Sequence, residues 1–500
     1  MDFSNFLLMK QEISLTIVFV VLFLYDVFCS EKGKQQFQLV ACTLFAIHTI
    51  FGFLPYVLEA IFGMKFLLSI GVLGFFSLPT GEAFGGMFIS SDITIFMKNI
   101  LNIATILVFL QTNTWLKAND TIHNRGEFFT ITLVTLLGMY LMVSAGNFMM
   151  LYIGMETASL PLACLAAFDK YKEKSAEAGA KYILVSALSS GIMLFGLSFL
   201  YGAIGTMYFS DMTAAVISEP LVIIGFVFFF SGLAFKLSLV PFHLWTADVY
   251  EGAPTSVTAY LSVVSKGAAA FALIFAIYKV FGHIEVVWHE ILWWLSVITI
   301  TIGNLFAIRQ KDIKRFFAFS SISQAGYILL GIIAGTSQGM TAMVYFILVY
   351  VFSNLAAFGV ISAVESKNGG NTLISAFNGL SKSNPVLSFV MMLAVFSLGG
   401  IPPFAGFFSK FFIFMAAAEQ GQYLLVFIAL LNTVISLFYY LLIVKAMYIK
   451  DGEEGAVARF VTDGYNKTSL VLCTLGIFVV GILSCIYEYV GTISYCLEGG

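Results

Sequence analysis

Residues 221–245 read LVIIGFVFFFSGLAFKLSLVPFHLW, an apolar run that holds one lysine, Lys236, and one proline, Pro241. A helix needs about 20 apolar residues to cross a bilayer, so this run is long enough for a membrane span. The same composition continues along the chain, because 60% of the 500 residues are hydrophobic and only 11% are charged. Lipid-facing backbone must form its hydrogen bonds within helices, so the sequence predicts an all-α polytopic membrane protein.

Similar apolar runs recur from one end of the chain to the other, and about fourteen of them are long enough to span. The predicted spans are 13–29, 37–58, 97–115, 128–147, 148–168, 179–202, 221–245, 255–281, 291–308, 316–335, 339–364, 385–416, 420–447 and 469–489. No small-residue cleavage site follows the first run, so we expect it to be a retained helix rather than a signal peptide.

Two regions near the N-terminus do not fit this pattern. Residues 59–79 contain an apolar run that is too short to span, and they stay unassigned. Residues 85–98 contain two short β-rich runs around Ser90, Ser91 and Asp92, which predicts a small hairpin outside the membrane. The expected division is therefore 1–127 for the N-terminal helices with the hairpin, and 448–500 for a C-terminal loop and last span, with two similar units between them.

Lysine and arginine are distributed unevenly between the predicted loops. If the loop after the first span is cytoplasmic, that side carries eighteen of the 25 basic residues, as expected for a cytoplasmic face. Both termini are then periplasmic. Four basic residues fall on the periplasmic side and three inside predicted helices: Lys10, Lys65, Lys98 and Lys279, and then Lys236, Lys266 and Lys410.

Several classes of function are excluded by residues that the chain lacks. The net charge of −3 and the absence of a basic block argue against nucleic-acid binding. The six cysteines have no spacing that suits zinc or an iron–sulfur cluster, so we expect them to be small apolar fillers. Neither a GxGxxG motif after a strand nor a P-loop is present, so redox chemistry would belong to partner chains.

Four ionisable residues lie inside predicted spans. Each buried lysine costs about 2.5 to 3.5 kcal/mol on insertion scales, and Glu156 adds a carboxylate in its own apolar span. Structural ion pairs or snorkelling lysines are one explanation, and a proton or ion path is the other. The path is favoured, because the charges occur in four separate helices and a buried lysine, unlike an arginine, takes up and releases a proton.

Helix breaks accompany two of these lysines. Pro241 follows Lys236, and Pro402 with Pro403 precedes Lys410; such breaks mark transport sites in many transporters, although a packed kink is the alternative for Pro241. His243 lies in the first break, either as a relay residue or as a structural histidine. His48 stands alone in its span and is interpreted as structural. Lys181, at the start of its helix, is either a buried relay residue or an interfacial anchor.

The order of the elements suggests an internal duplication. Residues 128–281 and 291–447 each hold five predicted spans, and in both units the fourth span is broken by proline and carries a lysine. An odd number of spans gives the two copies opposite orientations, as in inverted-repeat transporters. The second unit has Ser323 and Gln324 in its second span, where the first unit has a glutamate.

Three stretches resemble the antiporter-like, proton-conducting subunits of bacterial respiratory complex I. They are FKLSLVPFHLWTADVYEGAPT at 235–255, IKRFFAFSSISQAGY at 313–327 and GGIPPFAGFFSK at 399–410. Within this family the chain is most similar to the N type: it is too short for the lateral helix of the L type, and it has Lys410 where the M type has a glutamate. It departs from the N pattern between Glu59 and Gly85, where it has extra apolar residues.

The resemblance implies fourteen helices with two inverted five-helix repeats and a proton path through them. Glu156 would be the carboxylate that modulates Lys236, Lys266 the central lysine, and Lys410 the lysine of the second half-channel. Lys181 and His243 match further polar positions of the family. The resemblance also implies a translocase subunit of NADH:quinone oxidoreductase in the bacterial inner membrane.

No cofactor is expected in this chain, and NADH, FMN, iron–sulfur clusters and quinone would be bound by partner subunits. The expected partners are the neighbouring M-type subunit, the small K- and J-type subunits and the lipid bilayer. A component of a multisubunit cation/proton antiporter or of a membrane-bound hydrogenase is the alternative, and a purely structural subunit is the third hypothesis. The sequence does not decide between ubiquinone and menaquinone, or between H⁺ and Na⁺.

Overall fold

A computed structural model describes residues 4–62, 79–118, 124–216, 218–451 and 458–496 of the chain. Within these residues, 13 helices are long and apolar enough to cross a membrane. The apolar helix α19 (Pro385–Gly399) is shorter, and together with α20 (Ala405–Glu419) it makes a fourteenth, interrupted span. The expected all-α polytopic fold with about fourteen spans is thereby confirmed.

The elements of the first half comprise the long helices, one hairpin and short connecting helices. They are α1 Ser4–Leu7, α2 Lys10–Phe28, α3 Glu31–Phe62, β1 Gly81–Ala83, β2 Phe88–Ser90, α6 Asp92–Ala118, α7 Arg125–Val143, α8 Phe148–Ala166, α9 Glu173–Ile204, α10 Phe209–Ala215, α11 Pro220–Leu237 and α12 Leu244–Gly252.

The second half continues with one span that contains a π-helical segment, η2, and with several short helical turns. Its elements are α13 Thr255–Tyr260, η2 Leu261–Ser265, α14 Lys266–Val280, η3 Gly282–Ile284, α15 Glu285–Ile308, α16 Ile313–Ile333, α17 Ser337–Glu365, η4 Ile374–Phe377, α18 Leu380–Ser383, α19, α20, α21 Tyr423–Tyr448, α22 Gly464–Ile482 and α23 Ser484–Ile493.

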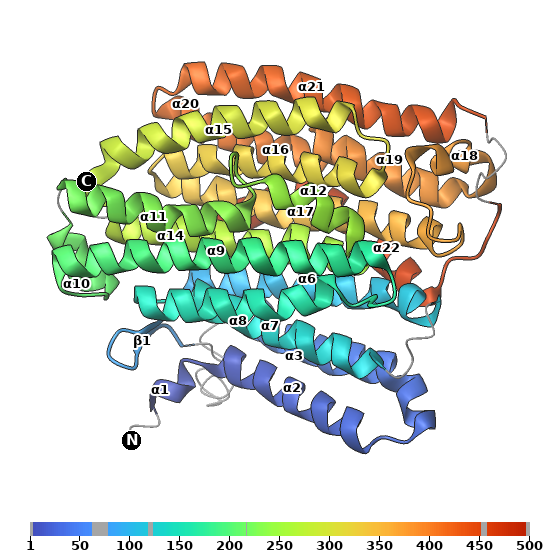
Figure 1. Ribbon diagram of the computed structural model, residues 1–500, viewed down its shortest axis with the longest axis horizontal. Coiled ribbons are helices and arrows are strands. Elements are labelled where there is room, and N and C mark those ends of the chain that lie inside the picture. The colour runs from blue at the N-terminus through green and yellow to red at the C-terminus, as the bar shows by residue number, and fades with distance from the viewer. Residues whose placement is uncertain (1–3, 63–78, 119–123, 217, 452–457, 497–500) are drawn as a thin grey trace.

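The helices lie side by side and nearly parallel in successive layers (Figure 1). α2 and α3 form one outer layer, α6 to α9 follow, and α15, α20 and α21 form the opposite side (Figure 1). The span 255–280, α16 and α17 are almost completely buried inside the protein, whereas only about a third of α2 and α21 is buried. The middle of the bundle is therefore shielded from lipid by its own helices, which suits buried polar residues.

Polar residues at the loop ends start several of these apolar helices. Asn147 accepts a hydrogen bond from the backbone N–H of Met150 at the start of α8. Asp312 accepts from Lys314 and Arg315 at the start of α16. Each side chain satisfies N–H groups that the first helical turn leaves unpaired, so the polar loops fix where the apolar segments begin.

Three predicted spans are interrupted. The run 221–245 is divided into α11 and α12, and the run 385–416 into α19 and α20, both at the predicted proline breaks. The run 469–489 was wrongly taken as one helix, because α22 ends at Ile482 and α23 starts at Ser484. Leu483 between them has an extended backbone, φ −86° and ψ 96°, which a continuous helix does not allow.

The small hairpin exists, but earlier in the chain than the sequence indicated. β1 and β2 pair antiparallel, with Gly81 opposite Ser90. The chain turns at Gly85 and Gly86, whose φ angles of +67° and +87° favour glycine. The run after Asp92 is the start of α6 and not a strand. The short apolar stretch 63–78, with Lys65, lies outside the described residues.

Close helix pairs depend on glycine at a few positions. A Cβ atom on Gly196 of α9 would lie 2.7 Å from the carbonyl oxygen of Gly225 on α11. Real Cβ atoms do not approach backbone so closely, so these two helices are packed backbone to backbone. The contact also sets the spacing of Tyr182 on α9 and Lys236 on α11.

Candidate functional site

Lys236 is placed in the last turn of α11 and is buried. Its Nζ donates to the hydroxyl of Tyr182 on α9 at 3.0 Å and lies 5.4 Å from the centre of that ring. The helix then ends at Ser238, which has a left-handed backbone with φ +62°. Lys236 therefore sits at the helix break with a neutral partner.

The break itself is held by polar contacts within the protein. The indole of Trp245 donates to the carbonyl oxygen of Phe235 at 3.2 Å, and the backbone N–H of Val240 donates to Thr299 on α15 at 3.1 Å. Interrupted helices in a membrane need such partners for the backbone groups that they release. Specific hydrogen bonds of the folded protein therefore stabilise the proline break next to Lys236.

Glu156 lies on α8, with its Oε1 buried and not hydrogen bonded to any residue that the structure describes. α8 packs against α9, which carries Tyr182, the partner of Lys236. The salt bridges of the described residues do not include Glu156 with Lys236. Glu156 is therefore a buried carboxylate on a helix next to the one that contacts Lys236.

Lys266 begins α14, directly after the π-helical segment η2, and is buried. Its Nζ donates to the hydroxyl of Ser321 on α16 at 2.8 Å and lies 5.5 Å from the ring centre of Tyr250 on α12. His243 directly precedes α12, and its Nδ1 is buried and unpaired within the described residues. Through Tyr250, the half-helix α12 that follows the first break contacts the central lysine.

Lys410 lies on α20 and is buried beside the second break. Its Nζ donates to the carbonyl oxygen of Gly399, the last residue of α19, at 3.4 Å, and lies 4.9 Å from the ring centre of Tyr327. A carbonyl at the end of a helix has no partner within that helix. The break at Pro402 and Pro403 therefore supplies an acceptor for this lysine.

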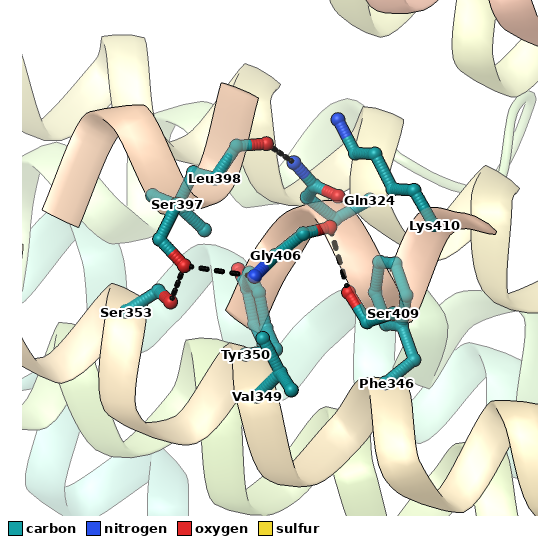
Figure 2. A pocket seen from close by; sticks show the side chains of 10 residues that line it. All are labelled: Gln324, Phe346, Val349, Tyr350, Ser353, Ser397, Leu398, Gly406, Ser409 and Lys410. Carbon is teal, nitrogen blue, oxygen red and sulfur yellow. Dashed lines mark hydrogen bonds between the residues drawn. The ribbon is translucent and has the colours of Figure 1, made fainter. Parts of the chain in front are cut away.

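Lys410 lines a small cavity together with polar side chains such as Gln324 and Ser397 (Figure 2). In this view the amide of Gln324 points to the carbonyl oxygen of Leu398, at 3.3 Å, and Ser397 lies between Ser353 and the backbone N–H of Gly406 (Figure 2). The hydroxyls of Ser353 and Ser397 are 2.7 Å apart. These groups both donate and accept, so they suit the passage of a proton.

A second, separate cavity lies beside the central lysine. It is lined by Leu237, next to Lys236, and by Lys266 and Ser321, and it shares Gln324 and Tyr350 with the cavity at Lys410. Each cavity has room for about one water molecule. The three buried lysines, on α11, α14 and α20, are called the row of lysines.

Lys181 does not belong to this row. Its side chain is 41% exposed and forms ion pairs with Glu177 at 2.6 Å and Asp248 at 2.5 Å. Of the two alternatives drawn from the sequence, the structure places Lys181 at the surface, as an anchor between α9 and α12. Buried Lys98 and Glu12, by contrast, were missed, because both lie at the edges of predicted spans and Lys98 was assigned to the periplasmic side.

Asp248 and its neighbour Glu251 on α12 are part of a surface cluster. Burial raises the pKa of Asp248, but hydrogen bonds from Lys181 and Arg315 outweigh burial and hold this pKa below its ordinary value. Burial likewise raises the pKa of Glu251, and hydrogen bonds from Lys174 and Arg315 lower it further than burial raises it. Both carboxylates are therefore charged at neutral pH.

The chain is similar to known membrane proteins along most of its length. Residues 145–436 match a family model described as "NADH:quinone oxidoreductase/Mrp antiporter, TM". The chain is 67% identical to the NADH-quinone oxidoreductase subunit N of Azobacteroides pseudotrichonymphae, and the match covers 99% of both chains.

Two solved structures resemble it in fold. A chain of respiratory complex I from Thermus thermophilus with bound aureothin is 26% identical, with a TM-score of 0.77, over 95% of this chain and 98% of that one. A chain of the Mrp complex from Dietzia sp. has a TM-score of 0.79 at 19% identity, over 99% and 97% of the two chains. At that identity the second likeness concerns the fold alone.

Proposed function

Because this chain belongs to the family of NADH-quinone oxidoreductase N subunits, we propose that it carries protons along the row Glu156, Lys236, Lys266 and Lys410. The chain is an antiporter-like, proton-translocating membrane subunit of that oxidoreductase. One observation gives the strongest support to the proposed path. The three lysines are buried on separate helices, and in the described part of the chain each binds a hydroxyl or carbonyl rather than a carboxylate.

Such partners leave each lysine able to change its charge. A salt bridge would fix the ammonium form, whereas Tyr182, Ser321 and the Gly399 carbonyl accept a hydrogen bond from the charged lysine without balancing its charge. Two like charges about 7 Å apart repel by roughly 2.4 kcal/mol at an effective dielectric constant of about 20. A proton that arrives on one lysine therefore favours release from the next.

Glu156 controls the first proton transfer, which is the release of a proton from Lys236. When its carboxylate is charged, it favours a proton on Lys236, and when that charge is neutralised or moved away, Lys236 gives its proton onward. The cavity from Leu237 to Lys266 and the shared Gln324 and Tyr350 supply the route to Lys410. His243 is a relay group beside Lys266 in this scheme, and Lys181 holds α12 from outside.

Several features of the whole protein belong to the same proposal. Residues 128–281 and 291–447 form two inverted repeats, in support of which the breaks α11/α12 and α19/α20 occupy corresponding places. Both termini face the periplasm of a bacterial inner membrane, in keeping with the loop charges. FMN, iron–sulfur clusters, NADH and quinone are bound by partner chains, and the M-, K- and J-type subunits are the membrane neighbours.

The test is to replace Lys236 with methionine in the assembled complex and to measure proton translocation together with NADH oxidation by quinone. Loss of translocation per NADH in a complex that still assembles is the expected result. Lys367→Met, at an exposed lysine, is the matched control and should leave both rates unchanged. If Lys236→Met pumps as well as the control, the row is structural and the proposal is wrong.

A second experiment tests the partners. The tagged chain is extracted gently from membranes and its co-purifying subunits are identified. Recovery of NADH:quinone oxidoreductase activity with flavin and iron–sulfur subunits is expected. A set of membrane antiporter chains without redox activity would assign the chain to cation/proton exchange instead.

A further inference from the structure

A second buried charge cluster lies in the N-terminal helices, apart from the row of lysines. Lys98 Nζ on α6 is 2.5 Å from Glu12 Oε1 in the first turn of α2, and the two side chains are 1% and 4% exposed. The matched family segment begins at residue 145, so this ion pair lies outside it. Taking two charges out of water costs several kcal/mol each, so the pair needs an explanation.

The surroundings of the pair are polar but incompletely hydrogen bonded. Lys98 Nζ is 5.0 Å from the ring centre of Phe88 on the hairpin and 5.7 Å from that of Tyr140 on α7. Gln11 Oε1, Glu12 Oε2 and Asn102 Nδ2 are buried, and none has a hydrogen-bond partner among the described residues. Unpaired buried polar atoms are costly, so a water molecule hydrogen bonded to them would stabilise this site.

Beside the pair, a chain of hydrogen bonds links Asn102 on α6 to Tyr140 on α7 and to His48 on α3. The hydroxyl of Tyr140 donates to Asn102 Oδ1, so its oxygen is free to accept from His48 Nε2, which is 3.1 Å away. His48 Nδ1 is 3.0 Å from the hydroxyl of Ser14 on α2. His48 is thus satisfied at both nitrogens, as expected of a structural histidine, but its partners belong to this charged cluster.

The helix that carries Tyr140 also contacts the span of the central lysine. Earlier on α7, Thr135 shares a 2.8 Å hydrogen bond with the hydroxyl of Tyr260, which also lies 4.0 Å from Met139 Sδ. Tyr260 is the last residue before η2, and η2 runs directly into Lys266. Thr135 and Tyr260 therefore place two hydroxyl groups between the helix of Tyr140 and the span that leads to Lys266.

We propose that Glu12, Lys98, Tyr140 and His48 form a second proton-binding site, which exchanges protons between the hairpin end of the bundle and Lys266. This inference rests on the proposed proton translocation. The titratable groups come from each element around the site: Glu12 from α2, His48 from α3, Lys98 from α6, Tyr140 from α7 and Tyr260 from α13. A proton that passes from Lys98 to Glu12 leaves the pair with no net charge, so the transfer itself adds no uncompensated buried charge.

The alternative explanation is a structural ion pair that only holds α2 against α6. The two explanations differ in what a charge-free replacement does. The double variant Glu12→Gln with Lys98→Met removes both charges, so it leaves no unpaired ion, but it also removes both proton carriers. A structural pair is rescued by this double variant, because replacing both partners is much less costly than removing one. A proton site is not rescued.

The experiment compares the double variant with each single variant in the assembled complex. Proton translocation per NADH oxidised is measured, with the amount of assembled complex as the check on folding. We expect the double variant to assemble better than either single variant and yet to lose translocation. Full translocation in the double variant, with loss in Lys236→Met, would overturn this inference and leave the proposed function standing. Full translocation in both would overturn the two together.

A gentler pair of variants decides the matter if the double variant does not assemble. Tyr140→Phe removes one hydroxyl from the middle of the chain and keeps the ring beside Lys98. Tyr171→Phe, whose side chain is 92% exposed, is the control. A fall in translocation for Tyr140→Phe alone, with unchanged assembly, supports the second site, and equal translocation in the two variants refutes it.

Discussion

Arg315 on α16 donates to Asp248 on α12 at 2.7 Å, and the same guanidinium nitrogen donates to Glu251 at 2.8 Å. α12 is the half-helix that follows the break beside Lys236, and α16 carries Ser321, the partner of Lys266. One arginine at the surface therefore ties together the two elements that position the first and the central lysine. A change in this contact alters their relative placement.

Replacing Arg315 with glutamine should loosen α12. Arg315 and Asp248 are about one-third exposed and Glu251 is 19% exposed, so the ion pairs are screened and their loss costs only about 1 kcal/mol. Hydrogen–deuterium exchange over residues 244–252 is the measurement, and faster exchange is expected. Lys382→Gln removes a fully solvated pair with Asp451 and is the control. Equal exchange in the two variants would show that α12 is held by other contacts.

The effect of Arg315 should depend on pH. Asp248 and Glu251 have pKa values below their ordinary values in the folded protein, so their stabilising contribution is present above about pH 4 to 4.5 and is lost as the pH falls through the lowered values. The stability difference between wild type and Arg315→Gln should therefore be largest near neutral pH and shrink in acid. Thermal unfolding in detergent across this range measures it, and a difference that grows in acid contradicts the assignment.

Tyr182→Phe should slow proton transfer through Lys236. The substitution removes the hydroxyl that accepts from Nζ at 3.0 Å but keeps the ring and its packing. A hydrogen bond to a charged group contributes about 1.5–3 kcal/mol, so protonation of Lys236 becomes less favourable by about that amount. Translocation at saturating NADH is measured, with the exposed Tyr423→Phe as the control. Unchanged translocation would mean that Tyr182 only packs.

Gln324 should control passage between Lys266 and Lys410. It lines both cavities and donates to Leu398 and Tyr440, so Gln324→Leu keeps a similar volume while removing the polar link. We expect translocation to fall while the complex assembles. Gln310→Leu, whose side chain bonds only its own helix in the described structure, is the comparison. A variant that pumps normally would place the route elsewhere.

Substitution of two glycines of α9 distinguishes the effect of close helix packing on stability from the effect of helix propensity. Gly196→Ala places a methyl group 2.7 Å from the Gly225 carbonyl oxygen, and overpacking of this kind costs about 1–3 kcal/mol. Gly191→Ala meets nothing within 4 Å and should be neutral or stabilise α9 by up to about 1 kcal/mol. Thermal unfolding of the purified complex compares them. Equal stability would mean that α9 and α11 can separate without cost.

Chain-local features of this protein were predictable because they depend on neighbours in sequence. Apolar length placed nearly every span, and Pro241, Pro402 and Pro403 marked two of the three interruptions. The third, at Leu483, has no proline, and the hairpin was shifted because short β-rich runs do not differ from the start of an apolar helix. The four intramembrane charges stood out because charge is rare in such helices.

The sequence by itself determined the membrane fold, the approximate number of spans and the lysines Lys236, Lys266 and Lys410 within them, since hydropathy, proline and charge act within a single helix. Only the tertiary structure decided which groups meet: Lys236 with Tyr182, Lys266 with Ser321, and Lys98 with Glu12. It also separated surface Lys181 from buried Lys98, two lysines that look alike at the end of an apolar run. The reason is physical, because burial and partners are set by the packing of helices that are distant in sequence.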